Sequence, residues 1–150
     1  MSNIKLNKIF KTVCIASDHA GYSLKEIIKN HLVDKNVSIF DIGPTSDSRV
    51  DYPKYAKKIA NRIKSRKSEV GILICGSGTG MAISANKIKT IRAAVCYNSA
   101  STRLSRQHNN ANIIALGSRL TKKKLSLKLV EIFLNTKFEG GRHLRRVKKI

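Results

Sequence analysis

The stretch Gly71-Ile-Leu-Ile-Cys-Gly-Ser-Gly-Thr-Gly-Met81 holds the most specific pattern in this chain. Its apolar, β-branched half is typical of a buried strand, and that half ends at Cys75. Glycines then alternate with Ser77 and Thr79, and glycine lets the backbone turn sharply and approach a ligand closely. We expect a helix to follow at Ala82–Lys87. The pattern therefore predicts a strand–loop–helix unit whose loop N–H groups converge into an anion site.

Cys75 lies at the carboxyl end of this predicted strand, where ligands bind in open parallel sheets. A thiol that faces several amide donors is suited to removing a proton next to a carbonyl, because the donors stabilise the oxyanion that forms. The alternative is a small buried core cysteine. The G-x-G-x-G spacing differs from the dinucleotide-binding G-x-G-x-x-G, and no P-loop lysine follows it, so the sequence argues against both nucleotide motifs.

Strand-like and helix-like segments alternate along the chain. The strand-like runs are Thr12–Ala16, Val37–Asp41, Val70–Cys75, Ala93–Tyr97 and Ile113–Leu116. The helix-like segments, besides the one after Met81, are Tyr22–Lys35, Pro53–Ser65, Ser99–Gln107, Thr121–Leu134 and a short one from Arg142 toward Lys149. This alternation predicts an α/β fold: a three-layer α/β/α, Rossmann-like domain with a five-stranded parallel sheet. No repeat or linker divides the chain, so we expect one domain over residues 1–150.

The composition indicates a soluble globular protein, since 41% of its 150 residues are hydrophobic. No apolar run approaches the ~20 residues that span a membrane. The segment Met1–Lys11 has charges throughout and lacks the apolar part of a secretory signal. Three cysteines without close spacing argue against a disulfide framework or a zinc site. We therefore expect a cytoplasmic protein with no membrane partner.

The net charge of +21 raises the possibility of nucleic-acid binding. Most lysines, however, fall on the polar sides of predicted helices, and no aromatic residues alternate with them as single-strand binding would favour. A positive field also helps to capture a small anionic substrate. We expect no specific nucleic-acid partner, and keep a basic nucleic-acid-binding protein as the non-enzymatic alternative.

Further polar residues follow the other predicted strands, and parallel strands deliver their loops to one edge of the sheet. The residues expected to converge there are Asp18, His19, Cys75, Ser77, Thr79 and Arg119. For Asp18 the alternative is a helix N-cap, and for His19 a solvent-exposed turn.

Two groups of residues lie outside these loops. His108 ends the fourth predicted helix, where a polar turn that favours the helix dipole is the alternative to chemistry. Arg142 and Arg146 are spaced i, i+4 and share a helix face, which suits a phosphate dianion. A solvated basic tail is the alternative for these arginines.

Seven motifs, in order and over nearly the whole length, resemble those of the type B ribose-5-phosphate isomerases, a family that includes the galactose-6-phosphate isomerase subunits. The motifs are Ser17-Asp-His-Ala-Gly21, Asp51-Tyr-Pro53, Ile74-Cys-Gly-Ser-Gly-Thr-Gly80, Ala85-Asn-Lys87, Leu104-Ser-Arg-Gln-His-Asn109, Leu116-Gly-Ser-Arg119 and Gly140-Gly-Arg-His143 with Arg146. The resemblance implies interconversion of ribose 5-phosphate and ribulose 5-phosphate through an enediolate, without metal or cofactor. It also implies a homodimer with active sites shared between subunits.

The resemblance also implies a role for each matching residue. Cys75 matches the residue that moves a proton between the first two carbons, and His108 matches the acid/base that opens the sugar ring. The anion hole is matched by Gly76, Ser77, Gly78, Thr79 and Gly80. The sugar-contacting positions are matched by Asp18, His19 and Asn109, and the phosphate grip by Arg119, Arg142 and Arg146.

One departure and one pattern refine this expectation. Met81 stands where some members carry a glutamate base, so Cys75 is the base expected here. The galactose-6-phosphate isomerase subunits generally lack the Arg106–Asn109 and Gly140–His143 patterns, so their presence favours the five-carbon substrate. Isomerases of allose 6-phosphate or galactose 6-phosphate remain alternatives. A redox-sensing role for Cys75 is another.

Overall fold

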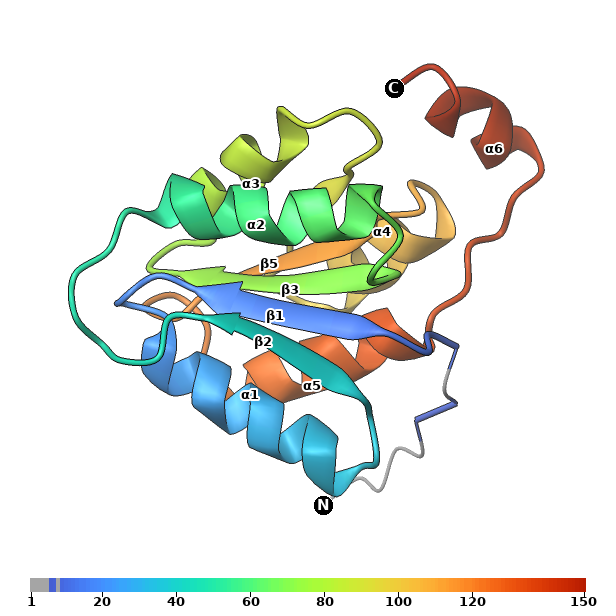
Figure 1. The fold of residues 1–150 in the computed structure, drawn as a ribbon. Helices are drawn as coiled ribbons and strands as arrows, with labels where there is room; N and C mark the ends of the chain where they lie inside the picture. The colour runs from blue at the N-terminus through green and yellow to red at the C-terminus, as the bar shows by residue number, and fades with distance from the viewer. Residues whose placement is uncertain (1–5, 8) are drawn as a thin grey trace.

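The computed structural model describes residues 6, 7 and 9–150, which form a three-layer α/β/α arrangement (Figure 1). Most of the segment examined for a secretory signal, residues 1–5 and 8, lies outside the described residues. The strands are β1 (Val13–Ser17), β2 (Ile39–Gly43), β3 (Val70–Cys75), β4 (Ala93–Val95) and β5 (Ile113–Gly117). They pair in parallel in the order β2-β1-β3-β5-β4. The predicted five-stranded parallel sheet is confirmed.

Helices cover both faces of the sheet (Figure 1). The helices are α1 (Tyr22–Asp34), α2 (Tyr52–Lys64), α3 (Thr79–Asn86), α4 (Ser99–Gln107), α5 (Lys123–Asn135) and α6 (Arg142–Val147). One face carries α2 packed against α3, and the other carries α5, which contacts both α1 and α4. The short α6 stands away from these layers at the end of an extended segment (Figure 1).

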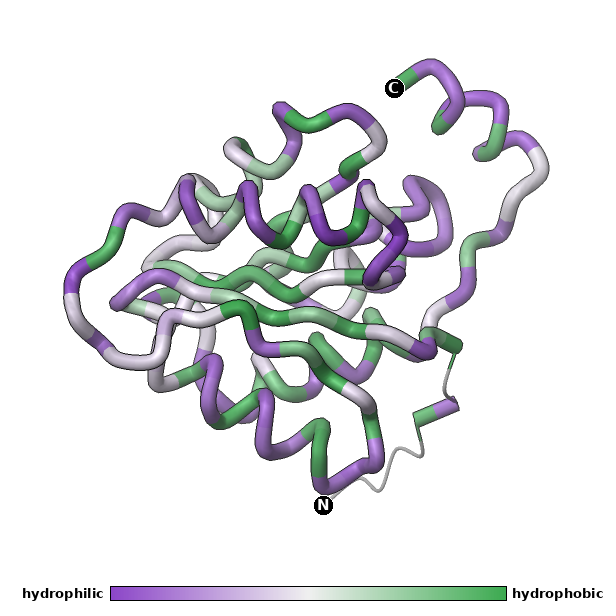
Figure 2. Tube along the Cα trace, viewed as in Figure 1, coloured by the Kyte–Doolittle hydropathy of each residue, from purple (hydrophilic) through white to green (hydrophobic). Residues whose placement is uncertain are grey.

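The core lies on both sides of the sheet, because strand side chains alternate between its faces. Ile15, Ile72 and Ile114 are completely buried in the cluster that includes α1 and α5. Leu73 and Ile113 point the other way, into the cluster that includes α2 and α3. Figure 2 shows the same distribution, with hydrophobic colour concentrated along the central strands. A sheet covered on both faces explains why β3 is a continuous apolar run.

The chain changes direction between β1 and β3, the pair of strands that positions the candidate site. From β1 the chain goes to β2 on one side, whereas from β3 it continues to β4 and β5 on the other. Ligands bind at the carboxyl ends of strands at such a switch point. The backbone N–H of Asp18, just after β1, donates to the carbonyl of Ile74 in β3 at 3.1 Å. The two loops with the most polar motifs are therefore neighbours.

Helix α1 is joined to β2 by a buried ionic cluster that the sequence pattern did not indicate. The Lys25 side chain has no exposed surface, and its Nζ lies 2.7 Å from carboxylate oxygens of both Glu26 and Asp41. Lys29 contacts the same two carboxylates at 2.8 Å. Paired charges of both signs allow this lysine to be buried.

Gly21 fixes the distance between the loop after β1 and strand β3. A Cβ at this position would lie 2.7 Å from the backbone carbonyl carbon of Ile74, which cannot move without distorting the sheet. We expect Gly21→Ala to lower the free energy of unfolding by about 1–3 kcal/mol, measured by chemical denaturation. The control Ser23→Ala, at an exposed position of α1, should change it by less than about 0.5 kcal/mol. An unchanged denaturation midpoint for Gly21→Ala would show that the close approach of Gly21 to Ile74 does not limit the stability of the fold.

Candidate active site

A cavity of about 480 Å³ opens at the carboxyl edge of the sheet, and we call it the thiol cavity. It is lined by Asp18, Tyr52, Cys75, Gly76, Ser77, Gly80, Arg119 and Leu120. These residues come from the loops after β1, β3 and β5, from the last residue of β3 and from the starts of α2 and α3. The predicted convergence is therefore confirmed for Asp18, Cys75, Ser77 and Arg119.

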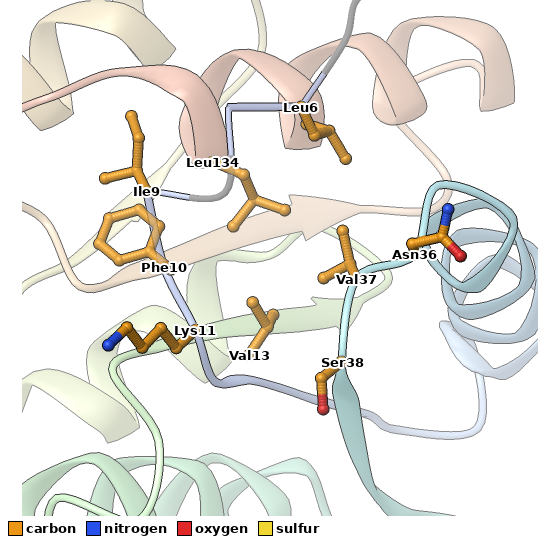
Figure 3. Close-up of a pocket in the computed structure, with 9 residues that line it drawn as sticks. All are labelled: Leu6, Ile9, Phe10, Lys11, Val13, Asn36, Val37, Ser38 and Leu134. Carbon is orange, nitrogen blue, oxygen red and sulfur yellow. The ribbon is translucent and has the colours of Figure 1, made fainter.

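A second cavity, of about 250 Å³, lies at the opposite end of the strands (Figure 3). Its lining is mainly apolar and includes Phe10, Val37 and Leu134. Among the described residues that line it, Lys11 is the only one with a titratable side chain. The described lining of this cavity offers no acid/base pair. The thiol cavity combines a thiol, a carboxylate and an arginine at the carboxyl edge of the sheet, and we therefore take it as the candidate active site.

The glycine loop places an amide donor directly on the thiol. Gly78 has a left-handed backbone with φ of 80°, and its N–H donates to Cys75 Sγ at 3.1 Å. Helix α3 begins at Thr79, three residues before the predicted Ala82. The loop is shorter than expected because Gly78 turns the chain straight into the helix. Cys75 therefore lies beside the N-terminus of α3.

Three glycines allow the loops around the cavity to touch. A Cβ on Gly117 would lie 2.8 Å from the Ser77 backbone, and one on Gly80 would lie 2.8 Å from the Tyr52 ring. A Cβ on Gly76 would lie 3.1 Å from Arg119 Nη1. The arginine and the tyrosine thus lie against the backbone of the glycine loop.

Asp18 is not the N-cap of α1, because that position is Gly21. The Asp18 side chain is buried, and Oδ1 accepts a hydrogen bond from the Gly21 N–H at 3.0 Å, which supports the start of α1. The same residue lines the thiol cavity. His19 is half-buried, with Nδ1 3.3 Å from the Val50 carbonyl oxygen, and Thr79 is exposed. Neither His19 nor Thr79 is among the residues that line the cavity.

The remaining predicted residues form a second group at the end of α4. The His108 ring stacks on His143 with centroids 4.1 Å apart and an angle of 10° between the planes. Asn109 is exposed, as are Arg142 and Arg146 on α6, on either side of His143. The described residues that line the thiol cavity include none of this second group. One chain therefore holds the predicted site residues in two separate places.

Arg106 holds the second group in position, a role that the sequence analysis missed. Its side chain is buried, and Nε donates to the Thr136 carbonyl at 3.1 Å while Nη1 donates to Asn110 Oδ1 at 3.0 Å. The guanidinium lies over the Phe133 ring, and burial lowers the Arg106 pKa to about 10. An arginine at a polar helix end is normally solvated, so nothing in the sequence indicated that Arg106 is buried. Its place in the Leu104–Asn109 motif was the only signal that could have drawn attention to it.

Tyr52 is a second missed residue. It belongs to the Asp51-Tyr-Pro53 motif, to which the sequence analysis assigned no role. Its ring lies 41% exposed at the start of α2, where it lines the thiol cavity beside Gly80. An aromatic ring at a cavity edge can pack against a ligand while its hydroxyl stays near water.

The other two cysteines occupy inert surroundings. Burial raises the pKa of the Cys14 thiol to about 11, and burial also raises the pKa of Cys96. Both side chains lie in the core, and neither lines the thiol cavity. A protonated, buried thiol reacts slowly, because the thiolate is the nucleophile.

Iodoacetamide should therefore label one cysteine per native chain, Cys75, near neutral pH. Peptide mass spectrometry over a time course measures the rate at each thiol, and a Cys75→Ser chain is the matched control. In that control, labelling should be slow until denaturant is added. Comparable labelling rates at Cys14 and Cys75 in the native chain would contradict this assignment.

Comparisons with known proteins agree with this geometry. The sequence pattern of the Ribose/Galactose Isomerase family matches residues 13–150. Ribose-5-phosphate isomerase B of Escherichia coli K12 is 44% identical over 140 residues, covering 93% of this chain and 94% of that protein. The Clostridium thermocellum ribose-5-phosphate isomerase B structure superimposes with a TM-score of 0.91 at 46% identity, covering 92% and 93% of the two chains.

A further solved structure was determined with a ligand. The Mycoplasma genitalium ribose-5-phosphate isomerase B with bound ribulose 5-phosphate has a TM-score of 0.88 to this chain at 43% identity, covering 92% of each. Both the sequence pattern and the fold are therefore shared over nearly the full length. This chain belongs to the ribose/galactose isomerase family.

Proposed function

We propose that this chain is a ribose-5-phosphate isomerase that interconverts ribose 5-phosphate and ribulose 5-phosphate, as one domain over residues 1–150. The observation that carries the proposal is the Cys75 thiol, which accepts an N–H from the glycine loop at 3.1 Å inside the thiol cavity. The names of the Escherichia coli and Mycoplasma genitalium relatives support the five-carbon substrate. The proposed reaction uses neither a metal nor a cofactor.

Cys75 acts as the base in the proposed mechanism. As thiolate, Sγ removes the proton from C2 of the open-chain aldose, and the C–H electron pair forms the C1–C2 double bond of an enediolate. The carbonyl electrons move to oxygen, where the N–H groups of Gly76–Gly80 stabilise the negative charge, an effect typically worth about 3–4 kcal/mol. The hydroxyl proton on the C2 oxygen passes to the C1 oxygen, so that the negative charge moves to the C2 oxygen. Return of the carbon-bound proton from Cys75 to C1 then gives the ketose, with its carbonyl at C2, and regenerates the thiolate.

The remaining residues bind and open the sugar. His108 moves a proton between the ring oxygen and the anomeric hydroxyl, because an imidazole suits proton transfer near neutral pH. Asp18, His19 and Asn109 contact sugar hydroxyls. Arg119, Arg142 and Arg146 bind the phosphate.

The active sites are shared between two copies of the chain in this proposal. Three observations support a homodimer. The thiol cavity and the His108 group are separate within one chain, and α6 stands away from the layers (Figure 1). Apolar side chains are also exposed beside both groups, including Leu120 at 64% next to the thiol cavity and Leu144 at 42% on α6. A second copy would cover these side chains and bring its His108 group to the Cys75 of the first.

The proposed location is the cytoplasm, as expected of an enzyme of sugar-phosphate metabolism. All three cysteines are free, which suits a reducing compartment. Within the described part of the chain, no helix combines the length and apolar character needed to cross a bilayer.

A coupled assay of the purified chain with three sugar phosphates tests the proposed function. Ribose 5-phosphate should be turned over with a higher kcat/KM than allose 6-phosphate or galactose 6-phosphate. A higher kcat/KM for a six-carbon sugar phosphate would change the proposed substrate but not the proposed type of reaction. No turnover, together with polynucleotide binding that weakens steeply with salt, would overturn the proposal in favour of a nucleic-acid role.

Substitution of His108 should separate ring opening from proton transfer. We expect His108→Asn to reduce turnover of cyclic ribose 5-phosphate by about 10²–10⁴-fold, the usual contribution of a general acid/base. Exchange of the substrate carbon-bound proton with solvent, followed by NMR on the acyclic ketose, should fall much less. Equal losses in the two assays would contradict a ring-opening role.

The arginines of α6 should act in the partner's site. Arg142→Ala and Arg146→Ala should each weaken substrate binding by about 1.5–3 kcal/mol, whereas Lys148→Ala, also on the exposed surface, should change it little. A chain with both arginine substitutions is then mixed with a Cys75→Ala chain. The heterodimer contains one intact site and one doubly defective site, so activity should reappear from two inactive parents. Heterodimers without activity would place the arginines outside the partner's site.

A further inference from the structure

A cluster of three potential metal ligands lies beside the proposed ring-opening residue. We call His108, Glu139 and His143 the histidine cluster. Glu139 Oε2 lies 3.9 Å from His108 Nε2 and 3.6 Å from His143 Nε2. The three ligand atoms lie within 4.8 Å of one another. Both imidazoles therefore direct the same ring nitrogen toward one carboxylate.

Backbone and ring contacts hold the cluster together before any ion binds. The Glu139 N–H donates to the Gln107 carbonyl at 3.1 Å, next to His108. The His143 N–H donates to the Gly140 carbonyl at 3.0 Å, and its ring is 7% exposed where it stacks on His108. Arg106 fixes the start of the same segment at Thr136. The two stacked planes are nearly parallel and an imidazole lone pair lies in its ring plane, so one ring has to turn out of the stack before both Nε2 atoms can face one ion.

The ligand set and its spacing fit a small transition-metal ion. Two imidazole nitrogens and one carboxylate oxygen, with a fourth position left to water, form a common open zinc site. Bonds of about 2.0–2.1 Å in a tetrahedron place ligand atoms about 3.3 Å apart. The two nitrogen–oxygen separations, 3.6 and 3.9 Å, are close to this spacing, and all three ligand atoms lie within 4.8 Å of one another. Imidazole ligands favour Zn²⁺ over the oxygen-seeking Mg²⁺ and Ca²⁺.

The charge around the cluster sets how the ion would bind. The Glu139 carboxylate and the two imidazoles of the cluster attract a divalent cation. Arg142 and Arg146 at the same time repel a divalent cation. These opposing effects favour a reversible ion over a permanent structural one.

We propose that the histidine cluster is an inhibitory zinc site. Zn²⁺ bound there occupies His108 Nε2 and removes that imidazole from proton transfer. The inhibitory consequence rests on the proposed role of His108, whereas the binding site rests only on the geometry of the cluster. Cysteine spacing argued against a zinc site, but a cluster built from a helix end and a distant segment has no spacing signature in the sequence.

Direct binding tests the site without reference to activity. The full-length dialysed protein is titrated with ZnCl₂ in competition with a chromophoric chelator, and with Co²⁺ to record its visible ligand-field absorption. One ion per chain should bind. His143→Asn and Glu139→Gln should each weaken binding about tenfold or more, and Glu139 is half-exposed, so its substitution preserves the fold.

Two controls separate this site from other places where zinc could bind. His31→Asn removes the other histidine that contacts a carboxylate, with Nε2 2.7 Å from Glu131, and should leave the affinity unchanged. Cys75→Ala should also retain the ion, because no thiolate takes part. Loss of binding in Cys75→Ala, or equal affinity in the wild type, His143→Asn and Glu139→Gln, would overturn the site.

Inhibition is measured as the Zn²⁺ concentration that halves each variant's own metal-free rate. That concentration should rise at least tenfold in Glu139→Gln relative to the wild type and stay unchanged in His31→Asn. Zinc bound at the cluster with undiminished turnover would overturn the inhibitory role. A chain that binds zinc there but has no isomerase activity would support the site while refuting the proposed function.

Discussion

The missing side chain at a few glycines is the constraint on which the thiol cavity depends. Gly117 lets the loop after β5 touch the backbone of Ser77, and Gly80 lets the Tyr52 ring lie on the glycine loop. Gly78 turns the chain so that its own N–H meets the Cys75 sulfur. The Gly78 N–H that faces the thiol is thus held by the path of the main chain, which leaves little freedom for it to reorient during a reaction.

The His108 group is built in the opposite way, from side chains. A buried guanidinium, a ring stack and the N–H of Glu139 hold the end of α4 against the 136–141 segment. Each contact uses a polar group that would be costly to bury alone, and each is satisfied by its partner. This part of the molecule therefore depends on a few long side chains for its geometry.

The sequence predicted the order and type of the elements well, because βα alternation and continuous apolar strands have strong local signals. It placed Asp18, Cys75, Ser77 and Arg119 at one edge because parallel strands all end there. It missed the burial of Lys25 and Arg106, since burial of a cation depends on partners far away in the chain, such as Asp41 and Thr136. It also placed the start of α3 too late, because the left-handed turn at Gly78 shortens the loop.

The separation of α6 from the layered body has a consequence for how the protein would behave at low concentration. If sites are shared, no monomer brings the Cys75 sulfur and the His108 imidazole together at one substrate, so only the associated form is catalytically active. Specific activity would then fall on dilution by mass action, and recovery would be second order in chain concentration. The free energy that holds two copies together would in that way also govern the fraction of assembled active sites.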